Sequence, residues 1–301
     1  MHEQLDLLLK QANQIILGKP KQLKLAVCCL LAQGHLLIED VPGVGKTTLA
    51  HTLARLFGLA YQRIQFTSDL LPADIIGVSI FEPDSGQFKF HQGPLFKQMI
   101  LADEINRSTP KTQSALLEAM EEHQVTVEGR TLTLPSPFFV IATQNPSHQI
   151  GTFPLPESQL DRFLMRIELG YPDRAAERAL LKGEARARLI ETLPTALTSE
   201  QLQHAQQAAS QVHVAEPLLD YVQAIIEFTR QSPEFNHGLS PRAGLALLTA
   251  AKAWVYLDQR DAVLPEDVQQ VLPAVAGHRL NASSPQSDAI VAPILDEVPV
   301  Y

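Results

Sequence analysis

Two patterns of apolar and polar positions fill the first half of this chain. Short apolar or alternating runs that stop at turn-forming residues are typical of buried strands, and they cover residues 36–38, 61–66, 99–102, 138–142 and 164–169. Segments with apolar side chains at helical spacing lie between them, at residues 5–16, 22–32, 47–57 and 112–123. Strands that alternate with helices predict an α/β fold, with a parallel sheet sandwiched between helical layers.

Two other segments interrupt this alternation and predict inserted β-hairpins. Residues 78–90 contain two β-rich runs around Pro83-Asp84-Ser85-Gly86. Residues 125–134 contain two more such runs around Glu128-Gly129-Arg130. Both hairpins are therefore expected to lie outside the main sheet.

After Tyr171-Pro172 the strand patterns stop and helical spacing takes over. The segments rich in alanine and leucine are residues 175–189, 199–210, 216–232, 241–257 and 265–276. From residue 281 on, prolines and serines predict an ordered or loose tail. We therefore expect two domains: an α/β core over residues 1–172, and a smaller all-helical domain with a C-terminal tail over residues 173–301.

The strand at residues 36–38 runs directly into a glycine-containing loop and a helix. Strand, glycine loop and helix in this order are the context that a phosphate-binding loop requires. The glycines let backbone N–H groups turn toward an anion at the positive end of the new helix. Lys46 would reach the β- and γ-phosphates of ATP, and the Thr47 hydroxyl would hold Mg²⁺. The predicted ATP-binding residues here are Asp40, Pro42, Gly43, Val44, Gly45, Lys46, Thr47 and Thr48.

One residue of this loop departs from the usual pattern, because Asp40 stands where a glycine is expected. Aspartate tolerates unusual backbone angles, so Asp40 is expected to make the turn itself. Its carboxylate must point away from the phosphates. The alternative is an ordinary strand-to-helix turn that happens to contain Gly-Lys-Thr.

Polar side chains follow two of the predicted central strands. Asp103 and Glu104 end the run at residues 99–102, and Asn145 follows the run at residues 138–143. Ligands bind at the carboxyl ends of strands in open parallel sheets. Asp103 would hold Mg²⁺, Glu104 would orient and deprotonate the attacking water, and Asn145 would bond that water or the γ-phosphate. The alternatives are a plain strand terminus for the two acids and an Asn-Pro turn for Asn145.

Three other places are candidates for nucleotide contacts. Arg162 lies in a short polar helix start, and Arg242 follows Ser240-Pro241, a typical helix beginning. The apolar corner formed by Ile16, Leu17 and Gly18 suits one face of an adenine ring, and simple helix packing explains it equally well.

Several of these motifs together resemble the MoxR family of AAA+ ATPases. The matching stretches are residues 39–47, 101–107, 142–146, 160–163, 239–243 and the closing Val-Pro-Val-Tyr. Aspartate at position 40 is what members of this family show. The resemblance implies that Lys46 and Thr47 are the Walker A residues, that Asp103 and Glu104 are the Walker B residues, and that Asn145 is sensor 1.

The same resemblance assigns the arginines and the assembly. It implies that Arg242 is sensor 2, which touches the γ-phosphate from the lid, and that Arg162 is the arginine finger for a neighbouring subunit. Arg166 is a weaker candidate for the finger. It also implies an AAA+ core and lid, hexameric rings, ATP with Mg²⁺, and a separate partner protein with a von Willebrand factor A domain. The expected activity is ATP-driven remodelling of client proteins, in complex maturation or metal-cofactor insertion.

Composition narrows the classes of function. Apolar residues make up 45% and charged residues 19% of the 301 residues, as in ordinary globular proteins. No apolar segment has membrane-spanning length, and the N-terminus lacks the pattern of a secretion signal. The adjacent Cys28 and Cys29 suit a reduced core, so a cytoplasmic location is expected.

Two alternatives to the remodelling ATPase stay open at this point. The first is a nucleic-acid motor, because helicase relatives carry similar hairpins. The net charge of −9 argues against it. So do the hairpin tips, because the first is Asp84-Ser85-Gly86-Gln87 and the second offers only Arg130 beside Glu128. The second is a nucleotide-dependent switch with little hydrolysis, against which the complete set of catalytic residue types argues.

Overall fold

A computed structural model describes residues 1–145, 152–182, 186–280 and 287–300 of the chain. Pro146 and Tyr301, which belong to the motifs quoted above, lie outside these residues. The central feature is a five-stranded sheet in which all strand pairs are parallel, in the order β2-β5-β8-β1-β9. Its strands are β1 (Leu36–Glu39), β2 (Tyr61–Gln65), β5 (Met99–Asp103), β8 (Phe139–Gln144) and β9 (Met165–Ile167).

Helices cover both faces of this sheet because alternate strand residues point to opposite sides. Leu36 and Ile38 pack in one apolar cluster with α1 (His2–Ile15), α2 (Pro20–Leu31) and α3 (Lys46–Leu56). Leu37 packs in the second cluster, with the side chains of α4 (Pro72–Ile76) and α5 (Pro110–Glu122). The predicted α/β sandwich is therefore present.

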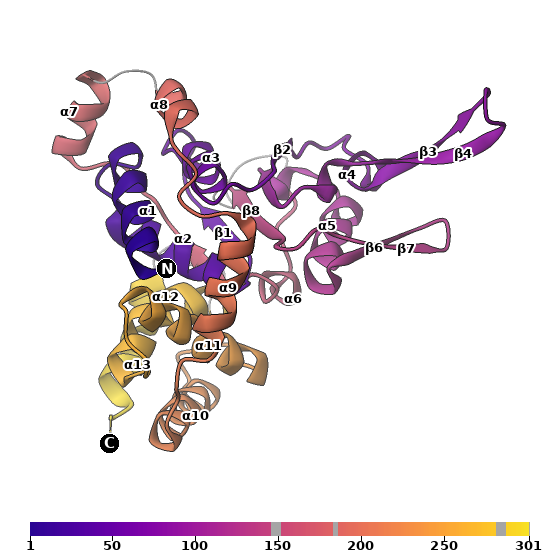
Figure 1. Ribbon diagram of the computed structural model, residues 1–301. Helices are drawn as coiled ribbons and strands as arrows, with labels where there is room; N and C mark the ends of the chain where they lie inside the picture. The colour runs from indigo at the N-terminus through magenta and orange to yellow at the C-terminus, as the bar shows by residue number, and fades with distance from the viewer. Residues whose placement is uncertain (146–151, 183–185, 281–286, 301) are drawn as a thin grey trace.

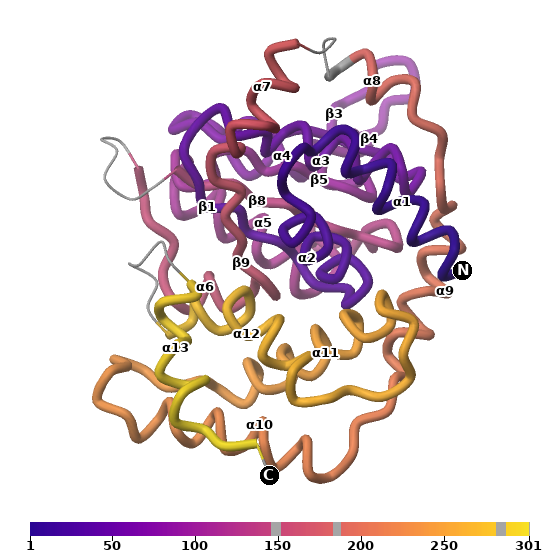
Figure 2. Tube along the Cα trace, turned by 90° about the vertical axis from the view of Figure 1, so that its left-hand side faces the viewer, coloured from indigo at the N-terminus to yellow at the C-terminus, as the bar shows by residue number. Residues whose placement is uncertain are grey.

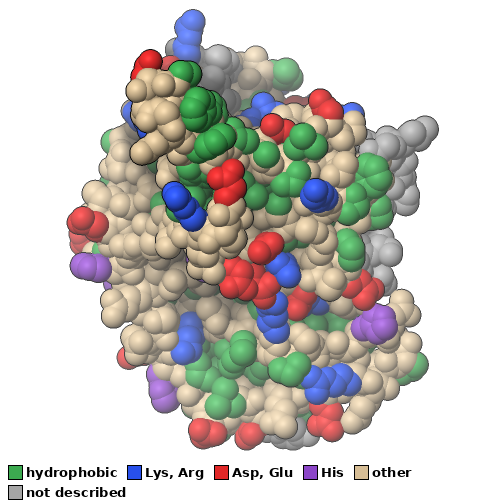
Figure 3. All heavy atoms as spheres, turned by 90° about the vertical axis from the view of Figure 1, so that its right-hand side faces the viewer, with side chains coloured by type: hydrophobic (Ala, Val, Ile, Leu, Met, Phe, Trp, Pro, Cys, Tyr) green, Lys and Arg blue, Asp and Glu red, His purple; other side chains and the backbone are tan. Residues whose placement is uncertain are grey.

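Both predicted hairpins are present and project from the body of the molecule (Figure 1). The first consists of β3 (Gly77–Glu82) and β4 (Gln87–Gln92), and the second of β6 (Gln124–Val127) and β7 (Arg130–Thr133). The Ser79 hydroxyl of the first donates a hydrogen bond to Glu128 of the second at 2.8 Å. The face that carries the hairpins shows apolar, acidic and basic side chains interspersed (Figure 3).

The second half of the chain is helical, as expected. Figure 2 shows most of these helices as a layer on one side of the sheet domain. They are α7 (Arg174–Lys182), α8 (Arg186–Thr192), α9 (Ser199–Ser210), α10 (Glu216–Gln231), α11 (Pro241–Leu257), α12 (Pro265–Leu280) and α13 (Ser287–Glu297). In the described parts of the chain, no helix combines the length and the apolar character needed to cross a bilayer.

The apolar core does not stop where the sheet ends. One cluster joins α1, α2 and α3 to α9, α11 and α12, and the buried Cys28 thiol on α2 donates to the Ala250 carbonyl on α11 at 3.2 Å. Helix α8 also packs on α3. The division of the chain after residue 172 therefore stays a prediction, since the helices that follow it share a core with those before it.

The stretch expected as a helix over 175–189 contains most of α7 and the start of α8. Residues 183–185, between these two helices, lie outside the described residues. The tail contains a helix, α13, despite Pro293, because Val291 and Ile294 are buried against the rest of the core. Tertiary packing outweighs the unfavourable local effect of proline here.

Three single-turn helices connect the larger elements: η1 (Pro94–Phe96), η2 (Ile105–Arg107) and α6 (Glu157–Leu160). Strand β9 is shorter than the alternation over residues 164–169 predicted.

Candidate nucleotide-binding site

The loop between β1 and α3 has the backbone shape of an anion-binding turn. Gly43 and Gly45 have φ angles of +87° and +99°, a left-handed conformation that side chains disfavour. A Cβ atom at either glycine would meet nothing within 4 Å, so the space inside the loop is open. Helix α3 starts directly after, at Lys46, and directs its N-terminal N–H groups toward this space.

Lys46 lies across the loop with its side chain buried. Its Nζ donates hydrogen bonds to the carbonyls of Asp40 at 2.5 Å and of Gln144 at 3.5 Å. Burial lowers the pKa of Lys46, and the negative charges of Asp40, Asp103, Glu104 and Glu39 oppose that shift. The surrounding acids therefore favour the charged ammonium, which is the form that binds phosphate.

Asp40 stabilises the loop differently from what the sequence predicts. Its carboxylate accepts hydrogen bonds from the backbone N–H groups of Val41 at 2.8 Å and Gly170 at 2.6 Å. The unusual backbone angles of the loop are taken by Gly43 and Gly45, and Asp40 has no positive φ. The expectation that Asp40 makes the turn by its own backbone is therefore wrong. Its carboxylate instead ties the loop to the segment after β9.

Asp103 ends β5 next to this loop, between β2 and β8. One carboxylate oxygen accepts from the Thr143 hydroxyl at 2.6 Å. The other accepts from Arg63, at 2.6 Å from Nη2 and 3.1 Å from Nε. The oxygen bonded to Arg63 thus accepts two hydrogen bonds and the oxygen bonded to Thr143 accepts one. The latter oxygen keeps a lone pair, so the carboxylate can still bind a water or a metal ion.

Glu104 leaves the line of the strand because its φ is +57°, a left-handed conformation uncommon for glutamate. Its backbone N–H donates to the Thr143 hydroxyl at 2.8 Å. Its carboxylate accepts from Asn145 Nδ2 at 3.0 Å, from Gln65 Nε2 at 2.9 Å and from Arg107 Nη1 at 3.1 Å. The structure thus brings Glu104 and Asn145 together, as the sequence predicts.

Sequence reasoning missed three polar side chains in this network: Arg63, Gln65 and Thr143. Thr143 lies inside a run read only as a buried strand. Arg63 and Gln65 belong to β2, whose place beside β5, with Gln65 paired to Asp103, is visible only from the strand order. The signal in the sequence was that polar residues occupy alternate positions of β2, which indicates that one face of this strand is polar.

Arg162 and Arg242, which have predicted roles as arginine finger and sensor 2, lie together. They are at the amino ends of the strands, at the opposite end of the sheet from the phosphate loop. Arg162 precedes the first residue of β9, whereas Lys46 follows the last residue of β1, and these strands are parallel neighbours. Arg162 pairs with Glu121 at 3.1 Å and donates to the Leu117 carbonyl at 2.9 Å. Arg242 pairs with the same Glu121 at 3.1 Å.

Arg242 does not lie beside the phosphate loop of its own subunit. Helix α5 begins near Glu104, at the carboxyl ends of the strands, and extends toward their amino ends. Near the end of α5, the carbonyl oxygen of Met120 lies 3.1 Å from Nε2 of His35, the residue just before β1. Glu121 and its arginines therefore lie at the amino ends of the strands, and the phosphate loop lies at the carboxyl ends. The lid helix that carries Arg242 packs at the edge away from its own loop.

Arg166 lies in a different environment from Arg162. It is a buried residue of β9, paired with Glu39 at 3.1 Å and hydrogen-bonded to Ser287 at 3.0 Å. A residue so enclosed cannot reach a neighbouring subunit, which favours Arg162 as the finger.

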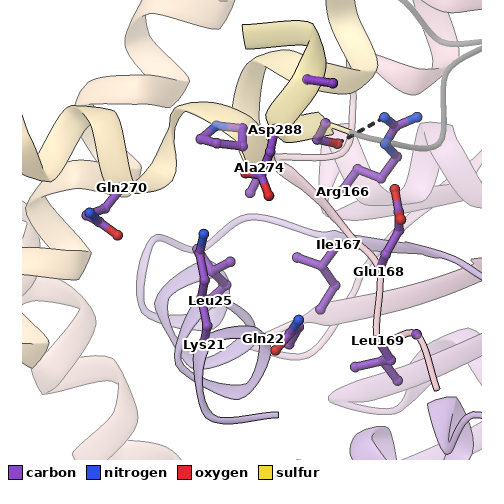
Figure 4. A pocket seen from close by; sticks show the side chains of 14 residues that line it. Lys21, Gln22, Leu25, Arg166, Ile167, Glu168, Leu169, Gln270, Ala274 and Asp288 are labelled. Carbon is purple, nitrogen blue, oxygen red and sulfur yellow. Dashed lines mark hydrogen bonds between the residues drawn. The ribbon is translucent and has the colours of Figure 1, made fainter. Parts of the chain in front are cut away.

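A cavity of about 570 Å³ lies behind the loop, between α2, the end of β9, α12 and α13 (Figure 4). The bond between Arg166 and Ser287 crosses one side of it. Burial raises the pKa of Glu168 on this cavity, and Arg166 opposes that shift. The loop glycines, Lys46, Asp103 and Glu104 do not line it, so it is separate from the phosphate site.

Comparisons with known proteins agree on one family. A model described as "ATPase family associated with various cellular activities (AAA)" matches residues 35–165, and one described as "AAA lid domain" matches residues 227–297. YeaC of Bacillus subtilis is 43% identical over 100% of this chain and 96% of its own length. Chaperone MoxR1 of Mycobacterium tuberculosis is 41% identical over 90% of this chain and 74% of its own length.

The chain belongs to the MoxR family of AAA+ ATPases. A solved structure from Cytophaga hutchinsonii, described as a candidate ATPase, agrees in fold. It superposes with a TM-score of 0.88 at 35% identity and covers 100% of this chain and 96% of its own. The sheet, the helical lid and the family therefore match what the sequence predicts.

The side chains of this MoxR-family site fit a nucleotide with a magnesium ion. Among the residues described, no cluster of three or more His, Cys, Asp or Glu could cage a metal. Thr47 is an exposed residue in the first turn of α3, and Asp103 ends β5, which only β8 separates from β1. One hydroxyl and one carboxylate suit Mg²⁺, which keeps waters and takes its other ligands from phosphates.

The apolar corner expected to hold adenine lies beside the start of α7. Ile16 is buried, Leu17 is half-buried and Gly18 is exposed, with a φ of +73°. A Cβ atom on Gly18 would lie 3.1 Å from the Cβ of Ala176. A role in adenine binding stays a prediction for this corner.

Proposed function

We propose that this MoxR-family protein hydrolyses ATP and uses that energy in a ring to remodel protein partners. The observation that carries the proposal is the hydrogen-bonded group of Asp103, Thr143, Glu104 and Asn145 beside the loop of Lys46. Catalysis of phosphoryl transfer depends on positioning and charge stabilisation, and this group offers both.

The reaction assigns one task to each side chain. The loop amides and Lys46 bind the β- and γ-phosphate oxygens. A water attacks the γ-phosphorus while the bond to the bridging oxygen breaks, and Glu104 takes the proton of that water. Asn145, bonded to Glu104, keeps that carboxylate and the water aligned. Thr47 and Asp103 would hold magnesium, which neutralises charge on the phosphate oxygens.

The arginines complete this chemistry only between subunits. Arg162 and Arg242 lie at the sheet edge away from their own loop, so both would serve the nucleotide of a neighbour. An arginine supplied in this way contributes about 10³–10⁵ in rate. The geometry supports a closed ring, and we propose a hexamer. The contact of Arg242 with a γ-phosphate, which the family resemblance implies, would in this proposal be made to the nucleotide of the neighbour.

The action on protein partners is supported by similarity and by shape. A relative 41% identical over most of the chain carries the name chaperone. The two hairpins extend beyond the body, where they can meet another chain (Figure 1). A separate protein with a von Willebrand factor A domain and a client in complex maturation or metal-cofactor insertion are part of this proposal.

Mixed rings test whether the site forms between subunits. Lys46→Ala removes the loop lysine but leaves the arginines, whereas Arg162→Ala leaves the loop intact. Each variant alone should lose nearly all ATP turnover. Mixing the two should restore part of it, because some interfaces then combine an intact loop with an intact arginine.

The proposal is contradicted if mixing the two variants restores no ATP turnover. Native mass measurement must first show that the rings contain both variants, and Arg162 would then have no role at a neighbour's site. Turnover that depends on added DNA, and not on protein partners, would favour a nucleic-acid motor.

A further inference from the structure

Glu121 forms ion pairs with both Arg162 and Arg242, at the amino ends of the strands. Its Oε2 accepts from Nη2 of Arg162 and its Oε1 accepts from Nη1 of Arg242, both at 3.1 Å. The three residues come from distant segments: the last turn of α5, the residue pair after α6, and the first turn of α11. One carboxylate therefore fixes the relative placement of two guanidinium groups.

Without this carboxylate the two guanidinium groups would not stay together. Two positive charges that are held by one carboxylate repel each other, and long side chains lose conformational entropy when they are held in one rotamer. Arg162 has a second fixed partner, the Leu117 carbonyl at 2.9 Å. Within the part of the chain that the structure describes, the one other ion pair of Arg242 is the looser contact with Asp161 at 4.0 Å. Arg242 therefore depends on Glu121 more than Arg162 does.

The other nearby carboxylate cannot replace Glu121. Asp161 accepts a hydrogen bond from Arg279 Nε at 2.6 Å, and Arg279 is fixed in turn by the carbonyls of Phe163 and Leu164. Asp161 and Arg279 thus neutralise each other. The remaining group of one carboxylate and two guanidiniums carries one net positive charge.

The two guanidinium groups remain able to bind an anion while they stay on Glu121. About a third of the Arg162 side chain and half of the Arg242 side chain are exposed, at 31% and 49%. A guanidinium has five N–H donors, and the bonds described here use only part of them. A phosphate that approached from outside could therefore be met by both arginines at once.

We infer that Glu121 is a positioning residue that holds Arg162 and Arg242 side by side for the nucleotide of the neighbouring subunit. This inference rests on the proposed trans site. Glu121 does not touch the nucleotide itself. Its contribution is to present two cations in a fixed arrangement, which is what transition-state stabilisation of a phosphoryl group requires.

The first test is Glu121→Gln, which keeps the shape but replaces one acceptor oxygen by an NH₂ group. That group repels one of the two guanidiniums, so turnover of the assembled ring should fall about 10- to 100-fold. ATP affinity and ring mass should stay at the wild-type values. Glu121→Asp, which retains a carboxylate, should recover part of the rate.

Glu122→Gln is the matched control. It removes a neighbouring exposed glutamate of the same helix that is outside the arginine pair, and it should leave turnover unchanged. Turnover of Glu121→Gln within about twofold of wild type, or above it, would overturn the inference.

The second test separates action on the neighbour from action on the own subunit. Glu121→Gln mixed with Lys46→Ala should regain turnover, because an intact loop then meets intact arginines. Glu121→Gln mixed with Arg162→Ala should not, since both chains supply faulty arginines. The opposite pattern would mean that Glu121 serves its own nucleotide.

These mixtures also distinguish the two proposals. If the Lys46→Ala and Arg162→Ala mixture regains turnover but the Glu121→Gln and Lys46→Ala mixture does not, only the role of Glu121 is overturned. If the first mixture fails, the trans site itself is wrong, and the role of Glu121 is rejected with it.

Discussion

Thr143 forms hydrogen bonds with both acidic residues of the site, Asp103 and Glu104. Its hydroxyl donates to Asp103 at 2.6 Å and accepts from the Glu104 backbone N–H at 2.8 Å. Both its donor and one acceptor position are therefore used, and its side chain is buried. It fixes the carboxylate of Asp103 and the turn that lifts Glu104 out of the strand.

Thr143→Val therefore removes two bonds without changing the volume. A buried donor or acceptor left unpaired costs about 1–3 kcal/mol, so the free energy of unfolding should fall by that amount. Turnover should fall about tenfold or more as Glu104 loses its alignment. Denaturant titration and a steady-state ATPase assay measure the two effects.

Thr143→Ser is the control, because it keeps the hydroxyl and should stay near wild type. A valine variant equal to wild type in both stability and turnover would show that the hydroxyl does not organise the acids.

At the scale of elements, helix α5 connects the two functional edges of the sheet. Near its start, Gln113 donates to the carbonyls of Ile105 and Ser108, in the segment after Glu104. Its last turn presents Glu121 to the two arginines. One helix thus connects the acids proposed to act in hydrolysis at one site with the arginines proposed to act at the next.

His35 locks the far end of α5 to the sheet. Its Nδ1 accepts from the Val140 N–H at 3.0 Å, so the proton lies on Nε2, which donates to the Met120 carbonyl at 3.1 Å. Only the neutral ring can make both bonds. Burial lowers the pKa of His35 from 6.5 to about 4, against a smaller opposing effect of the Met120 carbonyl.

This pKa predicts a specific loss of stability in acid. The unfolded chain binds a proton at this position below pH 6.5, whereas the folded chain does not until about pH 4. The free energy of unfolding should therefore fall by about 3 kcal/mol between these values. His35→Gln should lack this part of the pH dependence.

Urea titrations between pH 7 and pH 4 measure the effect as the difference in slope between wild type and variant. His204→Gln, at an exposed position of α9, is the control and should keep the wild-type slope. Equal slopes for wild type and His35→Gln would contradict the neutral buried ring.

The sequence was informative about these elements to different degrees. Apolar runs with polar ends predicted the central strands, and turn residues predicted both hairpins, because each signal is local. Strand order is not local, so the pairing of Gln65 with Asp103 and the contact of Arg63 could not be predicted. Helix α13 was missed because its stability comes from burial of Val291 and Ile294.

The same distinction applies to the site. Lys46, Asp103, Glu104 and Asn145 could be predicted from motifs that follow strands. The place of Arg242 in the fold could not be predicted, because a helix start shows that a side chain is presented but not where the helix packs. Glu121 gave no signal, since its two partners are 41 and 121 residues away along the chain.

At the scale of the whole molecule, one apolar core holds the phosphate loop and the opposite arginine edge in a fixed relation. The cluster runs from α1 and α3 through α2 into α11 and α12. Each subunit therefore offers a loop with its acids at one edge and a pair of arginines at the other. In the proposed ring, repeating this arrangement would complete every site.

In the proposed reaction, Glu104 activates water at a nucleotide held by the loop of Lys46. ATP binding and ATP turnover are compared in wild type and Glu104→Gln, with Lys46→Ala as the variant expected to bind ATP weakly. Glu104→Gln should bind ATP as wild type does and turn it over about 10²–10⁴-fold more slowly. Turnover of Glu104→Gln close to that of wild type would exclude this role of Glu104.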